Sequence, residues 1–264
     1  MPGYERLLGA VEPGKTVVFD IKGVSDTAKV TCSGKLSAVL ENGRLAVSAA
    51  PDAERSFAQV TVEDNGRKKD ITFIVAQGAK ILTAKDAVLS NGAKLVKADG
   101  KNVQDTVYFD KINSKAVFKT SLPAGKYQIW NLNRFESHAA SKYGDIQLVL
   151  KAPGFSGAIS HIRNTSSDYL KAEFGQPGAR SRFKWDFPYT TKTAFPYHRP
   201  ATADLKETQQ IEITQTRPMD GGVELAALLI LPCDDSGFAT EMIKVLCGVN
   251  YDKWNISQKL NFNK

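Results

Sequence analysis

The sequence predicts an all-β protein made of two successive β-sandwich domains, and three observations support this prediction. Short segments of alternating or continuous apolar character recur along the chain. Gly, Asn and Pro residues typical of tight turns separate these segments. The pattern pauses at residues 77–81 and then begins again. A chain of 264 residues with 42% hydrophobic content can bury two separate cores.

The first domain is expected over residues 1–80, where the strand-like segments are short and closely spaced. The dipeptides Asn42-Gly43 and Asn65-Gly66 are typical of hairpin turns. Short strands joined in this way favour a sandwich over a parallel sheet with helices. The expected strands are TVVFDI, AKVTC, SAVL, RLAVSA, FAQVTVED and DITFIVA, within residues 16–76.

Three longer stretches of this domain carry a family resemblance. They are PGKTVVFDI, SAVLENGRLAVSAA and AQVTVEDNGRKKDITFIVA, in that order. Their order resembles the immunoglobulin-like and cadherin-like spacer modules of large secreted bacterial proteins. The resemblance implies an immunoglobulin-like sandwich that separates other domains and carries no chemistry of its own.

The second domain is expected over residues 81–264 and has longer segments. Pro123-Ala124-Gly125 predicts a tight turn that leads into a strand beginning at Tyr127, and Gly221-Gly222 predicts another turn. The recognisable segments are TAKDAVLSNGAKLVKADG, AVFKTSLPAGKYQIWNLNRF, GDIQLVLKAPG, SRFKWDF and QQIEITQTRPMDGGVELAALLILPCDDSGF.

An ordered set of residues in these segments carries a second resemblance. The set comprises Gly125, Tyr127 and Trp130, then Phe183 and Trp185, then Ile211 and Ile213, and finally Gly222, Val223, Leu225, Leu228 and Leu229. Over residues 82–240 it resembles the galactose-binding-like jelly roll of carbohydrate-binding modules of families 6 and 35, also found in accessory domains of heparinase-type polysaccharide lyases. The resemblance implies a jelly-roll sandwich that binds a glycan in a secreted or cell-surface protein.

Members of this family often hold a structural calcium ion, and two departures affect that expectation. Thr83-Ala84-Lys85 stands where the family often has a pair of glutamates, and the usual aspartate of the closing strand is Ala226 or Ala227. Calcium needs several oxygen ligands. We therefore predict no cofactor and no metal site, while a calcium ion stays open because carboxylates lie nearby in sequence at Asp86, Asp105 and Asp110.

The formal net charge of +7 favours a polyanionic partner, such as an acidic polysaccharide. The Lys and Arg residues are dispersed, without the basic tracts of nucleic-acid-binding arms, so we expect a glycan and no nucleic acid. The longest apolar run, Leu225 to Leu231, is far shorter than the ~20 residues of a membrane-spanning helix, so no membrane insertion is expected. The N-terminus lacks a secretory signal pattern, so a secreted or cell-surface location depends on the resemblance.

The three cysteines, Cys32, Cys233 and Cys247, form neither a disulfide framework nor a metal-binding motif by their spacing. A bridge between Cys233 and Cys247 stays open, because sequence does not determine their geometry. The oligomeric state stays open as well.

The segment from Trp185 to Arg199, WDFPYTTKTAFPYHR, is the best candidate for a ligand-binding loop. Aromatic rings offer flat surfaces for the apolar face of a sugar. Two prolines exclude the interior of a regular strand, and related sandwiches have a short connection here. The alternative is that these rings plug the end of the sandwich. The predicted ligand-binding residues of this segment are Trp185, Tyr189, Tyr197, His198 and Arg199.

The strand expected from Tyr127 to Phe135 supplies two more candidates. Side chains alternate along a strand, so Tyr127 and Ile129 share one face while Trp130 and Arg134 share the other. If the first face belongs to the core, Trp130 and Arg134 can meet a ligand. The alternative is that loops cover this face and bury Trp130.

Arg182 is the last predicted ligand-binding residue. Together with Arg180 and Lys184 it forms a basic stripe at every second position before Trp185. Such a stripe suits an acidic polysaccharide, and the alternative is a solvated charged face.

No catalytic residue is predicted. His138, His161, Arg163, Tyr197 and His198 could act as acids or bases, but they occur without a recognisable motif. The sequence therefore predicts a non-catalytic glycan-binding or accessory module of a secreted carbohydrate-active protein. Two alternatives stay open: a β-sandwich polysaccharide lyase or glycoside hydrolase, whose paired carboxylates need not be close in sequence, and a structural or adhesive surface protein.

Overall fold

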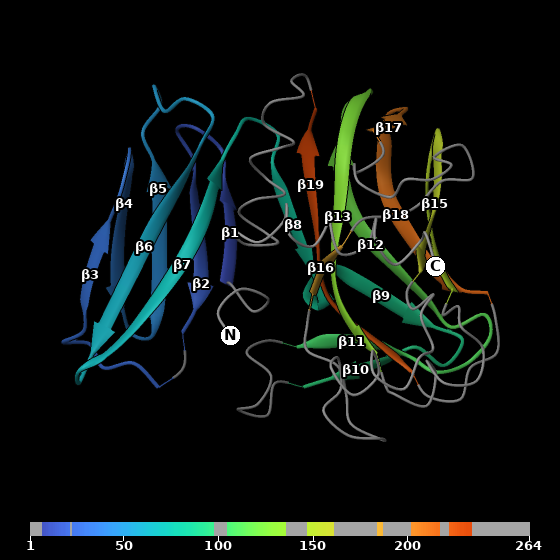
Figure 1. Cartoon of the computed structure of the whole chain (residues 1–264), viewed down its shortest axis with the longest axis horizontal. Coiled ribbons are helices and arrows are strands. Elements are labelled where there is room, and N and C mark those ends of the chain that lie inside the picture. The colour runs from blue at the N-terminus through green and yellow to red at the C-terminus, as the bar shows by residue number, and fades with distance from the viewer. Residues whose placement is uncertain are drawn as a thin grey trace, which may run out of the picture. The chain divides into compact units, whose positions relative to one another are not determined.

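A computed structural model describes residues 7–21, 23–97, 105–135, 147–160, 184–186, 202–216 and 222–233. Nearly all regular structure in these ranges is β-strand, organised in several sheets (Figure 1). The predicted fold class, all-β with two successive sandwiches, is confirmed. The chain divides into two compact units, Arg6–Ile81 and Leu82 onward.

The first unit is a sandwich of a four-stranded and a three-stranded sheet. The order of the larger sheet is β1-β7-β6-β3, with β1 parallel to β7, and the order of the smaller sheet is β2-β5-β4. The strands are β1 (Leu7–Val11), β2 (Thr16–Asp20), β3 (Lys29–Cys32), β4 (Leu36–Glu41), β5 (Arg44–Ala49), β6 (Ser56–Asp64) and β7 (Arg67–Val75).

Asn-Gly dipeptides form the two tight hairpins of this unit. Asn42 and Gly43 join β4 to β5 with φ angles of 50° and 69°. Asn65 and Gly66 join β6 to β7 with φ angles of 48° and 74°. A two-residue turn with positive φ at both positions matches the twist of the flanking strands, and Asn and Gly adopt it at low cost.

The core of the first unit lies between its two sheets. Leu45, Val47 and Val60 are fully buried there, and the ring of Phe73 meets the ring of Phe19 edge to face at 5.5 Å. Gly9 is required beside Phe73, because a Cβ atom at this position would lie 2.3 Å from that ring. This unit therefore has a hydrophobic core formed by its own residues.

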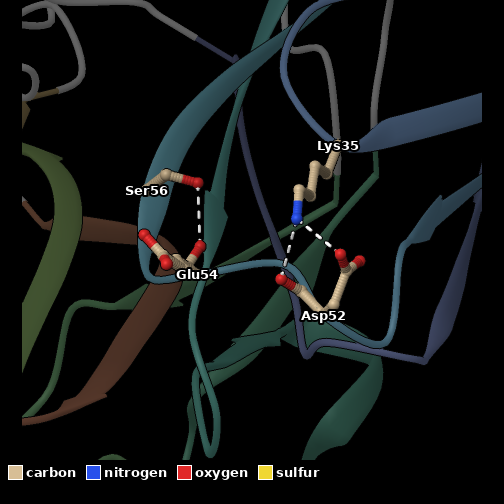
Figure 2. A network of polar contacts seen from close by, with 4 residues as sticks. All are labelled: Lys35, Asp52, Glu54 and Ser56. Carbon is tan, nitrogen blue, oxygen red and sulfur yellow. Dashed lines mark hydrogen bonds and ion pairs between the residues drawn. The ribbon is translucent and has the colours of Figure 1, made fainter.

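A polar contact holds the connection between β5 and β6. Lys35 Nζ donates to a carboxylate oxygen of Asp52 at 2.6 Å and to its backbone carbonyl at 3.1 Å (Figure 2). In the same connection, Ser56 Oγ donates to the backbone carbonyl of Glu54 at 3.0 Å. The hydrogen bond from Lys35 lowers the pKa of Asp52. Both ionised side chains are exposed, so this contact orders a loop more than it stabilises the fold.

The second unit is a sandwich of a seven-stranded and a five-stranded sheet. In the larger sheet the order is β10-β11-β19-β13-β16, β17 also pairs with β13, and β8 pairs with β19. In the smaller sheet the order is β15-β14-β18-β12-β9. The elements are β8 (Lys80–Thr83), the short 3-10 helix Ala84–Asp86, β9 (Ala87–Ser90), β10 (Lys94–Val96), β11 (Thr106–Phe109), β12 (Lys115–Leu122), β13 (Gly125–Phe135), β14 (Gln147–Ala152), β15 (Phe155–Ser160), β16 (Lys184–Asp186), β17 (Thr202–Leu205), β18 (Thr208–Gln215) and β19 (Val223–Pro232).

The core of the second unit lies between these two sheets. The larger sheet contributes Phe109 and Ile129, and the smaller sheet contributes Phe118, Leu150 and Ile213, all almost completely buried. Alternation places these residues on the inner faces, as expected for a sandwich. Strand β19 is buried almost throughout, which explains why its sequence is a continuous apolar run.

Cys32 and Cys233 are free thiols, and burial raises the pKa of Cys32. Cys247 lies outside the described residues. In the described part of the chain, no helix is long and apolar enough to cross a membrane.

Candidate functional site

The best candidate for a functional site in the second unit is the edge of β13 where a long aromatic-rich segment connects two short strands. Strands β16 and β17 both pair with this edge, Asp186 opposite Asn131 and Thr202 opposite Gln128. Along β13 these two pairing positions are three residues apart, about 10 Å at the usual rise of a strand. The chain between them, residues 187–201, is fifteen residues long. The aromatic-rich segment is therefore an insertion into one edge of the sheet.

Most of the predicted site residues belong to or flank this insertion. Trp185 is the central residue of β16, with its backbone opposite Leu132, and its side chain lies outside the described set. The other five positions lie outside the described residues: Arg182, Tyr189, Tyr197, His198 and Arg199.

Trp130 is not available to a ligand. Its side chain is 0% exposed, and its indole Nε1 donates to Oε1 of Gln128, which is also buried, at 3.3 Å. The prediction that Trp130 lies on a ligand-facing surface is therefore wrong. The face of β13 opposite the sandwich core is covered, as in the alternative interpretation of this strand, so the ring is a packing element.

Arg134 is engaged inside the protein as well. Its Nη2 donates to both carboxylate oxygens of Glu224, at 3.0 and 2.8 Å, and Oγ1 of Thr106 donates to one of the same oxygens at 3.1 Å. The Glu224 side chain is 2% exposed and the Arg134 side chain 16%. The guanidinium compensates a buried carboxylate, which favours a structural role for Arg134 over the predicted ligand-binding role.

A row of four side-chain positions crosses the outer face of this sheet. Lys94, Tyr108, Glu224 and Arg134 lie opposite one another on β10, β11, β19 and β13. Lys94 Nζ is 5.9 Å from the centre of the Tyr108 ring and forms an ion pair with Asp110 at 2.9 Å. We call Lys94, Tyr108, Glu224 and Arg134 the Tyr108 row. Its charges are paired, Arg134 with Glu224 inside the row and Lys94 with Asp110 outside it, which suits a structural network better than proton transfer.

Gly222 makes room for the Tyr108 ring, because a Cβ atom there would lie 2.2 Å from it. Sequence reasoning overlooked both Tyr108 and Glu224. Two signals were present: Glu224 is a lone carboxylate in an apolar strand, and Tyr108 alternates with the core residues Val107 and Phe109.

Two side-chain amides on β13 are buried with polar atoms that have no partner in the described part of the chain. Asn131 is 0% exposed and Asn133 1%. Among the described residues, neither Oδ1 nor Nδ2 of Asn131 has a hydrogen-bond partner, and Nδ2 of Asn133 has none either. Asn131 stands opposite Leu228, a core residue, so it faces the sandwich interior rather than a ligand. Buried amides of this kind are usually satisfied by ordered water.

The carboxylates considered for calcium each bind a neighbouring group of the protein. Asp86 accepts from the backbone N–H of Thr83 at 2.7 Å, and Asp105 and Asp110 form ion pairs with Lys97 and Lys94. Over the described ranges, no group of three or more His, Cys, Asp or Glu side chains is arranged to hold a metal ion.

No family model and no curated protein matches this sequence. Solved structures show distant similarity. The Agl-KA catalytic domain is 13% identical with a TM-score of 0.39, and the match covers 60% of this chain and 28% of that one. The CBM36-1 domain of a multidomain xylanase from the hindgut metagenome of Trinervitermes trinervoides is 11% identical with a TM-score of 0.38, covering 60% and 99%. A family 35 carbohydrate binding module from Clostridium thermocellum is 12% identical with a TM-score of 0.38, covering 60% and 100%.

Proposed function

We propose that this chain is a non-catalytic glycan-binding module of a secreted or cell-surface carbohydrate-active protein. In this proposal the second unit binds the glycan, and the first unit is an immunoglobulin-like spacer. The observation that carries the proposal is the fifteen-residue aromatic-rich segment between two strands that pair with the same edge of β13, in a sandwich whose described strands already enclose a hydrophobic core.

The insertion is longer than the fold requires. Asp186 and Thr202 pair with positions on β13 only about 10 Å apart, a gap that about three extended residues can span. The chain uses fifteen residues instead. They include Phe187, Tyr189, Phe195 and Tyr197, followed by His198. Surplus aromatic residues in a connection support a binding role, since loops on a rigid scaffold commonly carry ligand contacts.

Within the insertion we assign sugar stacking to Tyr189 and Tyr197, and polar contacts to His198 and Arg199. Trp185, on the flanking strand β16, and Arg182 complete the proposed surface. Aromatic side chains hold their shape with few rotatable bonds, so they lose little entropy on binding. Since Trp130 is buried and Arg134 binds Glu224, we assign no ligand contact to either residue.

The strand arrangement of the first unit supports the spacer role. Its seven strands divide into sheets of four and three, with the second, fifth and fourth strands forming one sheet and the third, sixth and seventh lying together in the other. This is the arrangement of B, E and D against C, F and G in immunoglobulin-like sandwiches. Several exposed charges pair locally, as in Lys35–Asp52 and Arg44–Asp20.

The test is a glycan array probed with the whole chain, followed by reducing-end and unsaturated-uronate assays on each glycan that binds. Binding without turnover supports the proposal. Turnover would indicate a lyase or hydrolase, and failure to bind any glycan would favour a structural or adhesive role. We expect binding to survive EDTA, because Asp105 and Asp110 already pair with lysines.

A further inference from the structure

The outer face of the five-stranded sheet in the second unit carries ordered rows of side chains, defined by strand register. Core residues of β12, β18 and β14 alternate with these positions, so the rows point away from the sandwich interior. The first row is Ser90, Lys115, Thr214, Val149 and Ala158; the second is Val88, Val117, Glu212, Lys151 and Ser156; the third contains Lys119 and Gln210. We call these twelve residues the lysine face.

The charge on this face is unevenly compensated. Lys115 Nζ binds Glu212 at 2.9 Å, and Thr214 Oγ1 donates to the other oxygen of that carboxylate at 3.0 Å. Lys119 and Lys151 are exposed, and neither forms an ion pair within the described ranges. Glu212 is the only carboxylate among the residues of the lysine face, and it faces both Lys115 and Lys151. Three lysines and one glutamate leave this face with a net charge of +2 for a partner.

The positions of the two lysines follow from sheet geometry. Lys151 stands opposite Glu212, and Lys119 stands opposite Gln210, two residues farther along β18. They are therefore two strands apart and two residues offset, about 12 Å between Cα atoms. Val88, 53% exposed, and Val117 add apolar surface next to these charges, while Ser156 and Thr214 add hydroxyls.

We infer that the lysine face is a second glycan-contact surface, which binds a polysaccharide carrying carboxylates at intervals along its chain. The inference builds on the proposed function and specifies the class of glycan. Lysine is a compact point charge that needs no fixed geometry, and this face has no arginine fork of the kind that suits paired oxygens on dense sulfate groups. Two separated lysines among hydroxyls and small apolar groups match a chain with a single carboxylate on each sugar better than a densely sulfated one.

The experiment measures binding of the whole chain to polygalacturonate, with neutral galactan and heparin as comparison polymers. The variant Lys119→Glu/Lys151→Glu reverses both charges. Lys15→Glu/Lys69→Glu is the matched control, because it changes the net charge equally at exposed positions of the first unit. Lys119→Ala/Lys151→Ala removes the charges without introducing repulsion. Melting temperatures of all variants should stay near wild type, since the altered side chains are exposed.

We expect the Glu variant to bind polygalacturonate ~10-fold more weakly than the parent protein. The Ala variant should lose less affinity than the Glu variant, and the control should bind almost as tightly as the parent. The affinity of the parent should fall as salt rises, since exposed charges are screened over ~10 Å at 0.1 M salt. Equal losses in the variant and the control would overturn the inference, as would tighter binding of heparin than of polygalacturonate. If neutral glycans bind and Lys119 and Lys151 have no effect, this inference fails while the proposed function stands. If no glycan binds, both fail.

Discussion

Arg134 on β13 donates two hydrogen bonds to the carboxylate of Glu224 on β19, at 3.0 and 2.8 Å, although the residues are 90 positions apart in the sequence. Removing one partner of a buried ion pair leaves the other charge uncompensated. We expect Glu224→Ala to reduce the free energy of unfolding by about 3 kcal/mol. Urea denaturation measures the loss. The double variant Arg134→Met/Glu224→Leu should recover much of it, and a single variant as stable as wild type would contradict the role assigned to the pair.

Trp130 should behave as a core residue. Since its side chain is fully buried, Trp130→Ala is expected to cost about 3–5 kcal/mol of unfolding free energy, and Trp130→Phe less. Denaturant melts provide the values. Glycan affinity, measured at a temperature where the Phe variant is folded, should match wild type. A stable Phe variant with weakened binding would restore Trp130 as a ligand contact.

Tyr197 should behave in the opposite way. We expect Tyr197→Ala to weaken glycan binding by about 1–3 kcal/mol, the loss typical of an aromatic anchor, with little change in melting temperature. Tyr197→Phe keeps the stacking surface and should retain most of the affinity. Isothermal titration with a glycan selected from the array provides the measurement. A large drop in melting temperature with unchanged affinity would indicate that the insertion is a structural plug.

The Glu212–Lys115 pair predicts a pH dependence. The hydrogen bond from Lys115 lowers the pKa of Glu212 below its ordinary value of 4.5. Ionised Glu212 therefore contributes stability that is present above that ordinary value and is lost as pH falls through the lowered pKa. Glu212→Gln should be less stable than wild type at pH 7, by less than about 1 kcal/mol because the pair is partly solvated. Thermal melts should show this difference shrinking toward pH 3, and a constant difference would contradict it.

The first unit should fold alone. Its seven strands and their core lie within residues 7–75, and Phe73 is fully buried in that core. A fragment of residues 1–81 is expected to give a β-type circular dichroism spectrum and one cooperative urea transition. Phe73→Ala in the same fragment should cost about 3–5 kcal/mol. A helical or unfolded spectrum for the unaltered fragment would refute the expectation.

Local patterns in the sequence were sufficient to predict the fold class and much of its detail. The Asn42-Gly43 and Asn65-Gly66 turns occur as hairpins, because positive φ at both positions is a property of these residues and needs no tertiary context. Alternation likewise placed Tyr127 and Ile129 on the core side of β13. The composition of the segment from Trp185 to Arg199, rich in aromatic residues and broken by two prolines, is sufficient to predict a long connection there.

The sequence by itself thus determined the all-β class, the main turns and the alternation of faces, since each depends on residues within a few positions of one another. The tertiary structure decided what covers each face and which distant groups meet. Alternation placed Trp130 on the face of β13 that points away from the core, yet Trp130 is buried there too. Arg134 contacts Glu224 only because β13 and β19 are neighbouring strands. Burial and charge compensation depend on long-range strand pairing, which local periodicity does not encode.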